Sequence, residues 1–181
     1  EDLEANLQDL SARLKRMGYR PQPKRRVYIP KPGSEKGRPL GMNRFEDKIV
    51  ELATKRVLEP LFESLFEECS YGYRPERSPH QCLDTLGRTL QQKRVNHLVE
   101  ADIRGFFDAV HHEWLLKFLG QRIGDNRVLR LISRMLKAGI MEDGLVEAAE
   151  VGTPQGSMLS PLLSNVYLHD VLDIWFQRRV R

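Results

Sequence analysis

The 181-residue chain contains few cysteines and no long apolar run. Its two cysteines, Cys69 and Cys82, are too few for a disulfide framework or a metal knuckle. No apolar stretch approaches the ~20 residues that a membrane-spanning helix needs, and the first residues show no signal-peptide pattern. These absences argue against a disulfide-rich secreted protein and against a membrane protein. We expect a cytoplasmic, intracellular protein in which both thiols are buried as small apolar groups.

Acidic residues are nearly absent between Arg13 and Arg44. This block contains eleven Lys or Arg residues and one acid, Glu35, a net charge of +10, whereas residues 45–181 sum to −2. Such a block favours a polyanionic partner, and the alternative is a solvated surface with no partner. The block also carries a strand–turn–strand pattern, which a solvated tail would not need. We therefore favour nucleic acid or nucleotide phosphate as the partner.

The spacing of apolar residues predicts a helix-rich α+β fold with short antiparallel strands. Expected helices cover residues 2–17, 45–58, 78–90, 112–120, 126–137 and 159–181. Pro60 is expected to interrupt the second of these, with a short helical continuation over residues 61–66. Expected strands cover residues 25–29, 38–42, 97–103, 140–141 and 145–151. The third helix begins with a serine cap and a proline, and its expected buried stripe consists of Cys82, Leu83, Leu86 and Leu90.

Asp102 is the strongest candidate for a catalytic residue. Two-metal phosphoryl transfer needs carboxylates that hold two divalent cations ~4 Å apart, and Mg²⁺ prefers oxygen ligands. An isolated Asp at a strand end more often caps a turn, but here Gly105 and the pair Phe106-Phe107 follow. This context favours the catalytic interpretation. Asp108 is the competing carboxylate, which we expect to cap the helix that follows.

Phe106 and Phe107 are expected to point in opposite directions, because neighbouring side chains alternate along extended backbone. We expect Phe106 to line a nucleotide pocket, where its ring would clash with the 2′-hydroxyl of a ribonucleotide. We expect Phe107 to fill the core. The alternative is that both rings belong to the core.

The loop of residues 153–157 precedes a predicted helix. Gly156 lacks a Cβ, so the backbone can approach a ligand closely, and the N–H groups at a helix start favour anions. The following Ser160-Pro161 is equally consistent with an ordinary helix start.

Several basic side chains are candidates for phosphate contacts. Lys31 and Arg38 flank the hairpin turn and could clamp a triphosphate, whereas Lys24, Arg25 and Arg26 suit general contacts with an RNA backbone. The neighbouring His111 and His112 have no third metal ligand at a suitable spacing, so we predict that both are surface residues.

Segments spread over roughly residues 24–170 together resemble reverse transcriptases of the group II intron type. They are Arg26–Lys31 with Arg38–Gly41, Ser70–Pro75, Ala101–Asp108, and Thr153–Gly156 with Ser160–Asn165. The third segment is similar to motif A of these enzymes and the fourth to motif B. In the second segment, Tyr73 stands where the family usually has Phe.

The resemblance implies a right-hand polymerase with fingers over residues 1–96 and a partial palm over residues 97–181. Asp102 would be the first catalytic aspartate and would hold Mg²⁺ together with the carbonyl of Ile103. Phe106 would be the aromatic residue that senses the sugar. The other residues that would contact the nucleotide are Lys31, Arg38, Gln155 and Gly156.

The resemblance also implies a bacterial RNA-directed DNA polymerase that uses RNA, primer DNA and deoxynucleoside triphosphates. The family completes its site with Tyr-Ala-Asp-Asp or a variant, which this sequence does not contain. We therefore expect an N-terminal fragment that is inactive on its own. One alternative is a non-catalytic RNA-binding or dimerising module with a polymerase fold, which could form a homodimer. Another is a group II-like reverse transcriptase of a defence system.

Overall fold

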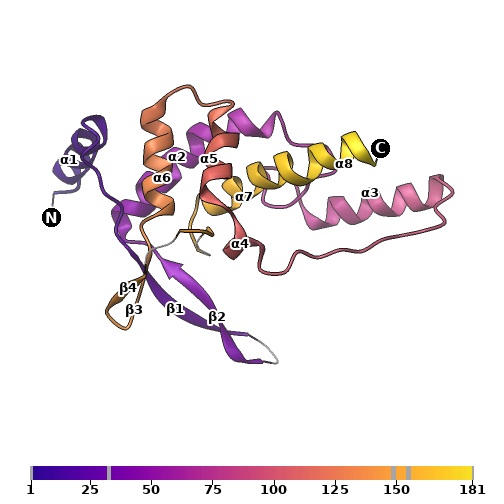
Figure 1. Ribbon diagram of the computed structural model, residues 1–181, viewed down its shortest axis with the longest axis horizontal. Coiled ribbons are helices and arrows are strands. Elements are labelled where there is room, and N and C mark those ends of the chain that lie inside the picture. Colours follow the sequence, from indigo (N-terminus) through magenta and orange to yellow (C-terminus); the bar gives the residue numbers. More distant parts are fainter. Residues whose placement is uncertain (1, 32–33, 148–149, 154–155, 181) are drawn as a thin grey trace.

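The computed structural model describes residues 2–31, 34–147, 150–153 and 156–180. In chain order, its elements are α1 (Leu3–Lys15), β1 (Lys24–Lys31), β2 (Ser34–Met42), α2 (Phe45–Glu63), α3 (Pro79–Gln92), α4 (Phe106–Ala109), α5 (His112–Gly120), α6 (Asn126–Leu136), β3 (Ile140–Glu142), β4 (Leu145–Glu147), α7 (Ser160–Leu168), the π-helical turn η1 (His169–Asp173) and α8 (Ile174–Arg179). Figure 1 shows the β1–β2 hairpin projecting from a group of helices. The expected helix-rich α+β fold is confirmed.

A four-stranded sheet in the order β2-β1-β3-β4 joins strands from both halves of the chain. The strands β1 and β2 are antiparallel, with Ile29 opposite Arg38, as the first predicted hairpin requires. β1 runs parallel to β3, where Lys24 pairs with Ile140. β3 and β4 form the second predicted hairpin around Asp143-Gly144, and the structure describes β4 over Leu145–Glu147. The division into fingers and palm at residue 96 stays a prediction.

The hydrophobic core lies where α2, α5, α6 and α7 meet (Figure 1). Its best-buried side chains on these helices are Val50, Leu58, Phe62, Leu115, Leu119, Ile132, Met135, Leu136, Leu162, Leu163 and Val166. Tyr19, just before β1, is also buried and donates a hydrogen bond to Asp47 of α2. Burial and this hydrogen bond raise the pKa of Tyr19. The contact fixes the connection between α1 and β1 on the surface of α2.

α2 continues through Pro60, where the sequence predicts an interruption. Proline lacks an N–H group and crowds the preceding helical turn, which weakens a helix interior. Leu58 and Phe62 lie on either side of it and are both buried in the core. Their packing holds the helix together, and α2 ends at Glu63, within one turn of the proline.

α3 begins as predicted, but its apolar stripe is not buried. The hydroxyl of Ser78 accepts a hydrogen bond from the N–H of Gln81, whose side chain accepts from the N–H of Ser78. α3 is described over its whole length and contains no buried residue; Leu83, for example, is 63% exposed. In Figure 1, α3 extends away from the core helices. The prediction of buried thiols is also wrong, because Cys69 is exposed and Cys82 is half-buried.

Residues 97–103 do not form the predicted strand. This segment leads from α3 back to α4 without pairing to any described strand, and Val99 is 89% exposed. A strand exists only where a neighbour takes up its backbone hydrogen bonds, and an apolar run does not show whether that neighbour is present. Asp102 therefore lies on an exposed segment and not at the end of a sheet strand.

The remaining helices agree with the sequence prediction. α5 and α6 match their expected ranges, and a continuous helical path runs from Ser160 to Arg179 through η1. No helix of the described residues is long and apolar enough to cross a membrane.

Candidate functional site

Four segments that are distant in sequence enclose a hollow of about 320 Å³. Leu40 comes from β2, Tyr73 from the loop before α3 and Phe107 from α4. The fourth segment contributes the start of α7 and the loop before it: Gly156, Ser157, Met158, Ser160 and Pro161. Each of these segments carries one of the motifs recognised in the sequence. The fold therefore brings those motifs to one place.

The two phenylalanines of motif A have exchanged the places expected from the sequence. Phe107 lines the hollow, and its ring lies edge-on to that of Tyr73 with 6.5 Å between centroids. Phe106 packs against the core, with its centroid 6.4 Å from that of Tyr167. The reason is Gly105, whose φ of 63° turns the chain directly into α4. The alternation of side chains along extended backbone does not apply in a helical turn.

Backbone hydrogen bonds join the turn of motif A to the loop of motif B. The N–H of Thr153 donates to the carbonyl of Phe107 at 2.6 Å, and the N–H of Gly152 donates to that of Val110 at 2.8 Å. A Cβ on Gly152, which has a φ of 88°, would lie 3.1 Å from the Phe107 carbonyl oxygen. His112 is buried with its Nε2 2.7 Å from the Gly152 carbonyl oxygen, so the predicted surface role for it is wrong.

Buried Glu51 anchors the motif B loop to α2. Its carboxylate accepts hydrogen bonds from the hydroxyl of Ser157 at 2.8 Å and from the N–H of Met158 at 2.9 Å. It also lies 2.8 Å from the ammonium group of Lys24. Glu51 is 2% exposed and Lys24 is 4% exposed. Lys24 therefore forms an internal ion pair, and the prediction that it contacts RNA is wrong.

Sequence reasoning missed Glu51, because a glutamate on a helix is normally exposed. One signal was available. Glu51 lies at helical spacing from Leu58 and Phe62, on the face of α2 that is buried. An acid on the apolar face of a helix indicates a buried partner, which here is Lys24 on a strand 27 residues earlier.

Gly156 brings the motif B loop against β2. It has a φ of 97°, and a Cβ placed on it would lie 2.9 Å from the carbonyl oxygen of Gly41. Only glycine fits this approach without movement of the backbone. The contact lies beside Leu40 and closes one side of the hollow. The neighbouring Gln155, predicted to line the nucleotide site, falls outside the described residues.

The remaining predicted phosphate contacts lie on the β1–β2 hairpin. Arg25 and Arg38 are exposed there. Arg26 is half-buried, with its Nε 3.5 Å from the carboxylate of Glu142 on β3, so its charge is partly compensated. The backbone of Lys31 pairs with Ser34, but its side chain is not among the described parts of the chain.

Asp102 and Ile103 are both exposed on the segment before α4. Within the described ranges, no three His, Cys, Asp or Glu side chains gather where they could hold a metal ion. A two-metal site needs several carboxylates, so Asp102 can supply one ligand but does not form such a site alone. Asp108 does not cap the following helix as expected. It lies inside α4, and the residue before α5 is His111.

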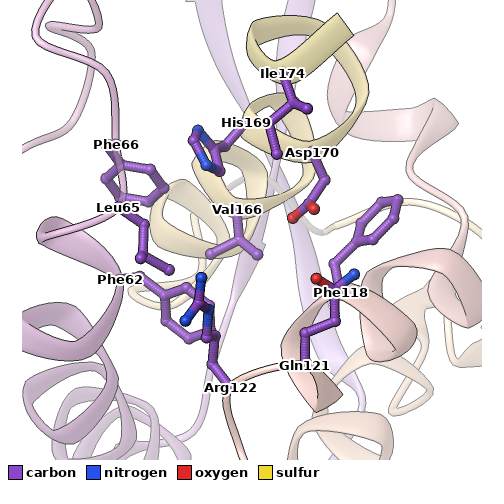
Figure 2. A pocket seen from close by; sticks show the side chains of 10 residues that line it. All are labelled: Phe62, Leu65, Phe66, Phe118, Gln121, Arg122, Val166, His169, Asp170 and Ile174. Carbon is purple, nitrogen blue, oxygen red and sulfur yellow. The ribbon is translucent and has the colours of Figure 1, made fainter.

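A second cavity of about 50 Å³ lies between the end of α2, α5 and the C-terminal helices (Figure 2). The residues that line it are Phe62, Leu65, Phe66, Phe118, Gln121, Arg122, Val166, His169, Asp170 and Ile174. In the η1 turn, His169 lies 3.6 Å from Asp173, and burial raises the pKa of Asp173 and of Asp170. This cavity has room for one or two water molecules but not for a nucleotide.

Comparisons with known proteins agree with these motifs. A family model for "Reverse transcriptase (RNA-dependent DNA polymerase)" matches residues 29–179. Group II intron-encoded protein LtrA of Lactococcus lactis subsp. cremoris is 42% identical over 168 residues, which are 93% of this chain and 28% of LtrA. Protein YkfC of Escherichia coli strain K12 is 43% identical over 171 residues, which are 93% of this chain and 45% of YkfC.

A solved structure, that of a partial Cas6-RT-Cas1–Cas2 complex, superposes with a TM-score of 0.62 at 27% identity. The match covers 98% of this chain and 30% of that one. The chain therefore spans less than half the length of the relatives named here. The resemblance to group II intron reverse transcriptases and the polymerase fold are confirmed. This chain belongs to the reverse transcriptase (RNA-dependent DNA polymerase) family and has group II intron-encoded proteins among its relatives.

Proposed function

We propose that the hollow between Tyr73, Phe107 and Gly156 receives the incoming nucleotide of an RNA-directed DNA polymerase. The supporting observation is that β2, motif A and motif B meet there and nowhere else among the described cavities. Its volume of about 320 Å³ suits a small ligand, and its walls are aromatic, apolar and glycine backbone. Such walls can hold a base and sugar while phosphates extend toward the basic hairpin.

Phe107 takes the sugar-sensing role that the sequence assigned to Phe106. Its ring lines the hollow, whereas the ring of Phe106 packs on Tyr167 and the core. A ring beneath the sugar leaves no room for a 2′-hydroxyl, the group that distinguishes ribonucleotides from deoxynucleotides. Deoxynucleoside triphosphates are therefore the proposed substrates.

Asp102 is proposed as one ligand of a Mg²⁺ site, together with the backbone carbonyl of Ile103. Bound Mg²⁺ would neutralise phosphate charge and align the reacting oxygens. The exposed position of Asp102 leaves room for further carboxylates. We propose that parts of the full-length protein other than residues 1–181 supply them. Lys31, Arg38 and Gln155 remain the proposed contacts to the triphosphate and nucleotide.

RNA and primer DNA are the proposed polymer partners, with Arg25 as a contact to the RNA backbone. Arg26 makes a smaller contribution to this contact, because Glu142 compensates part of its charge. The higher identity to the intron-encoded protein, 42%, than to the Cas-associated structure, 27%, supports an intron enzyme over a defence system. A homodimer stays a prediction, which sedimentation of the chain would test.

Primer extension by the full-length protein that carries this sequence tests the catalytic role. Asp102→Asn should abolish extension, because a neutral amide cannot replace a carboxylate as a ligand of Mg²⁺. RNA affinity and thermal stability should be unchanged, because Asp102 is exposed and the substitution is nearly isosteric. Extension at a near-normal rate in the variant would refute the catalytic role of Asp102. Absence of extension by the unmodified full-length protein would support the non-catalytic module instead. Asp84→Asn, an exposed substitution on α3, is the matched control and should leave extension intact.

A further inference from the structure

Basic side chains surround a second surface of the molecule, beside α6. Arg20, Arg130, Arg134 and Lys137 line a shallow hollow of about 540 Å³, together with two prolines, a serine and an alanine. None of its described lining residues is acidic. It shares no lining residue with the hollow around Phe107, so the two surfaces are distinct.

The sequence of α6 creates this surface. Arg127, Arg130, Arg134 and Lys137 follow one another at helical spacing along one face, while the opposite face is buried in the core. Arg127 pairs with Asp125 at the start of the helix. The other three form no ion pair within the part of the chain that the structure describes. The net charge of −2 for residues 45–181 conceals this stripe.

Arg134 is held in place at the centre of the group. Its guanidinium donates hydrogen bonds to the carbonyl oxygens of Met17 at 2.9 Å and Tyr19 at 3.2 Å. Partial burial, with repulsion from Arg20 and Arg130, lowers the pKa of Arg134. Cations that repel one another and are fixed by the fold create a positive potential, which a bound anion relieves.

We propose that this basic hollow binds the phosphate backbone of structured RNA. The inference rests on the proposed function, from which RNA follows as the polymer, and adds a surface outside the nucleotide site. Three of the four cations are arginines, whose planar forks match phosphate oxygens. The hollow also overlaps the basic block of residues 13–44, because Arg20 belongs to both.

The chemistry of the hollow fits RNA better than an anionic membrane. Membrane-surface binding needs large apolar side chains that enter the bilayer, and the lining residues include no aromatic or long aliphatic side chain. Backbone phosphates instead need an array of fixed cations and no particular sequence.

The test measures the affinity of this chain for a labelled RNA hairpin between about 50 and 200 mM salt. The variant Arg130→Ala/Lys137→Ala removes two exposed cations and keeps Arg134, which supports the backbone. The matched control, Arg88→Ala/Lys93→Ala, removes two exposed cations on and after α3. Two lost phosphate contacts should weaken binding about tenfold at the lower salt concentration and flatten its salt dependence, while the control binds as the unmodified chain does.

A third variant, Arg25→Ala/Arg38→Ala on the hairpin, separates this inference from the function on which it rests. If RNA binds and only the hairpin variant weakens it, the hollow is not a binding surface and the proposed function stands. If the unmodified chain does not bind RNA at all, the proposed RNA partner itself fails. Vesicles with anionic lipid serve as the second probe. If Arg130→Ala/Lys137→Ala binds vesicles less well but binds RNA as the unmodified chain does, the inference is also overturned. If the double variant melts early, Lys137→Glu alone replaces it, because Lys137 is exposed just after the helix.

Discussion

The carboxylate of Glu51 accepts a hydrogen bond from the hydroxyl of Ser157, at 2.8 Å, and so joins α2 to the loop before α7. The same carboxylate pairs with Lys24 of β1. One buried acid therefore connects three elements: the basic hairpin, a core helix and the motif B loop. The position of that loop beside the hollow lined by Tyr73 and Phe107 depends on this connection.

Lys24→Met should destabilise the chain by about 3–5 kcal/mol, because it leaves the buried carboxylate of Glu51 without its cation. Lys55→Met is the matched control. Lys55 pairs with Glu59 on the same helix as Glu51, but both side chains are partly exposed, and the loss should stay below about 1 kcal/mol. Urea unfolding of both variants measures the difference. Equal losses would show that the Lys24–Glu51 pair is not held in the interior.

Gly156→Ala should destabilise the chain more than Gly144→Ala. Both glycines have positive φ values, 97° and 80°, so both substitutions carry a conformational cost of about 1–2 kcal/mol. A Cβ added at Gly156 would meet the backbone carbonyl of Gly41. A Cβ added at Gly144 would have nothing within 4 Å. The clash should add about 1–3 kcal/mol. Thermal melting compares the two, and a similar shift in both would contradict the close approach of the motif B loop to β2.

Arg74→Ala should loosen the loop that places Tyr73 in the hollow. The buried guanidinium donates to the carboxylate of Glu63 and to the carbonyls of Glu67 and Ser70. Its removal takes the arginine donor from all three, and of the two carbonyls that of Glu67 still accepts from the N–H of Ser70. The expected loss of stability is about 3 kcal/mol. Limited proteolysis should then cut within residues 67–75, whereas the exposed Arg88→Ala should resist as the unmodified chain does. Unchanged resistance in Arg74→Ala would remove its role in holding this loop.

Local sequence signals predicted much of the fold. The Ser78 cap, the Asp143-Gly144 turn and the spacing of α5 and α6 depend on neighbouring residues alone. Features that depend on a distant partner were missed or wrong. Among the residues that the structure describes, no strand pairs with the apolar run at 97–103 and no element buries the apolar stripe of α3.

The candidate site shows the same limit at single residues. Motif spacing selected the correct turn, but the φ of Gly105 decides which phenylalanine enters the hollow. Composition placed Lys24 in a basic surface block, whereas its buried partner Glu51 lies on a helix that follows the hairpin. Alternation and charge density describe segments, and they do not show how one segment packs on another.

The choice between deoxy- and ribonucleotides in primer extension tests the account most directly. In the full-length protein, Phe107→Ala should admit ribonucleotides at least tenfold more readily, because it removes the ring that lines the hollow. Phe106→Ala should keep the preference for deoxynucleotides and lower stability by about 2 kcal/mol, less than for a fully buried ring. The account is contradicted if Phe106→Ala changes the sugar preference and Phe107→Ala does not, or if neither variant changes it.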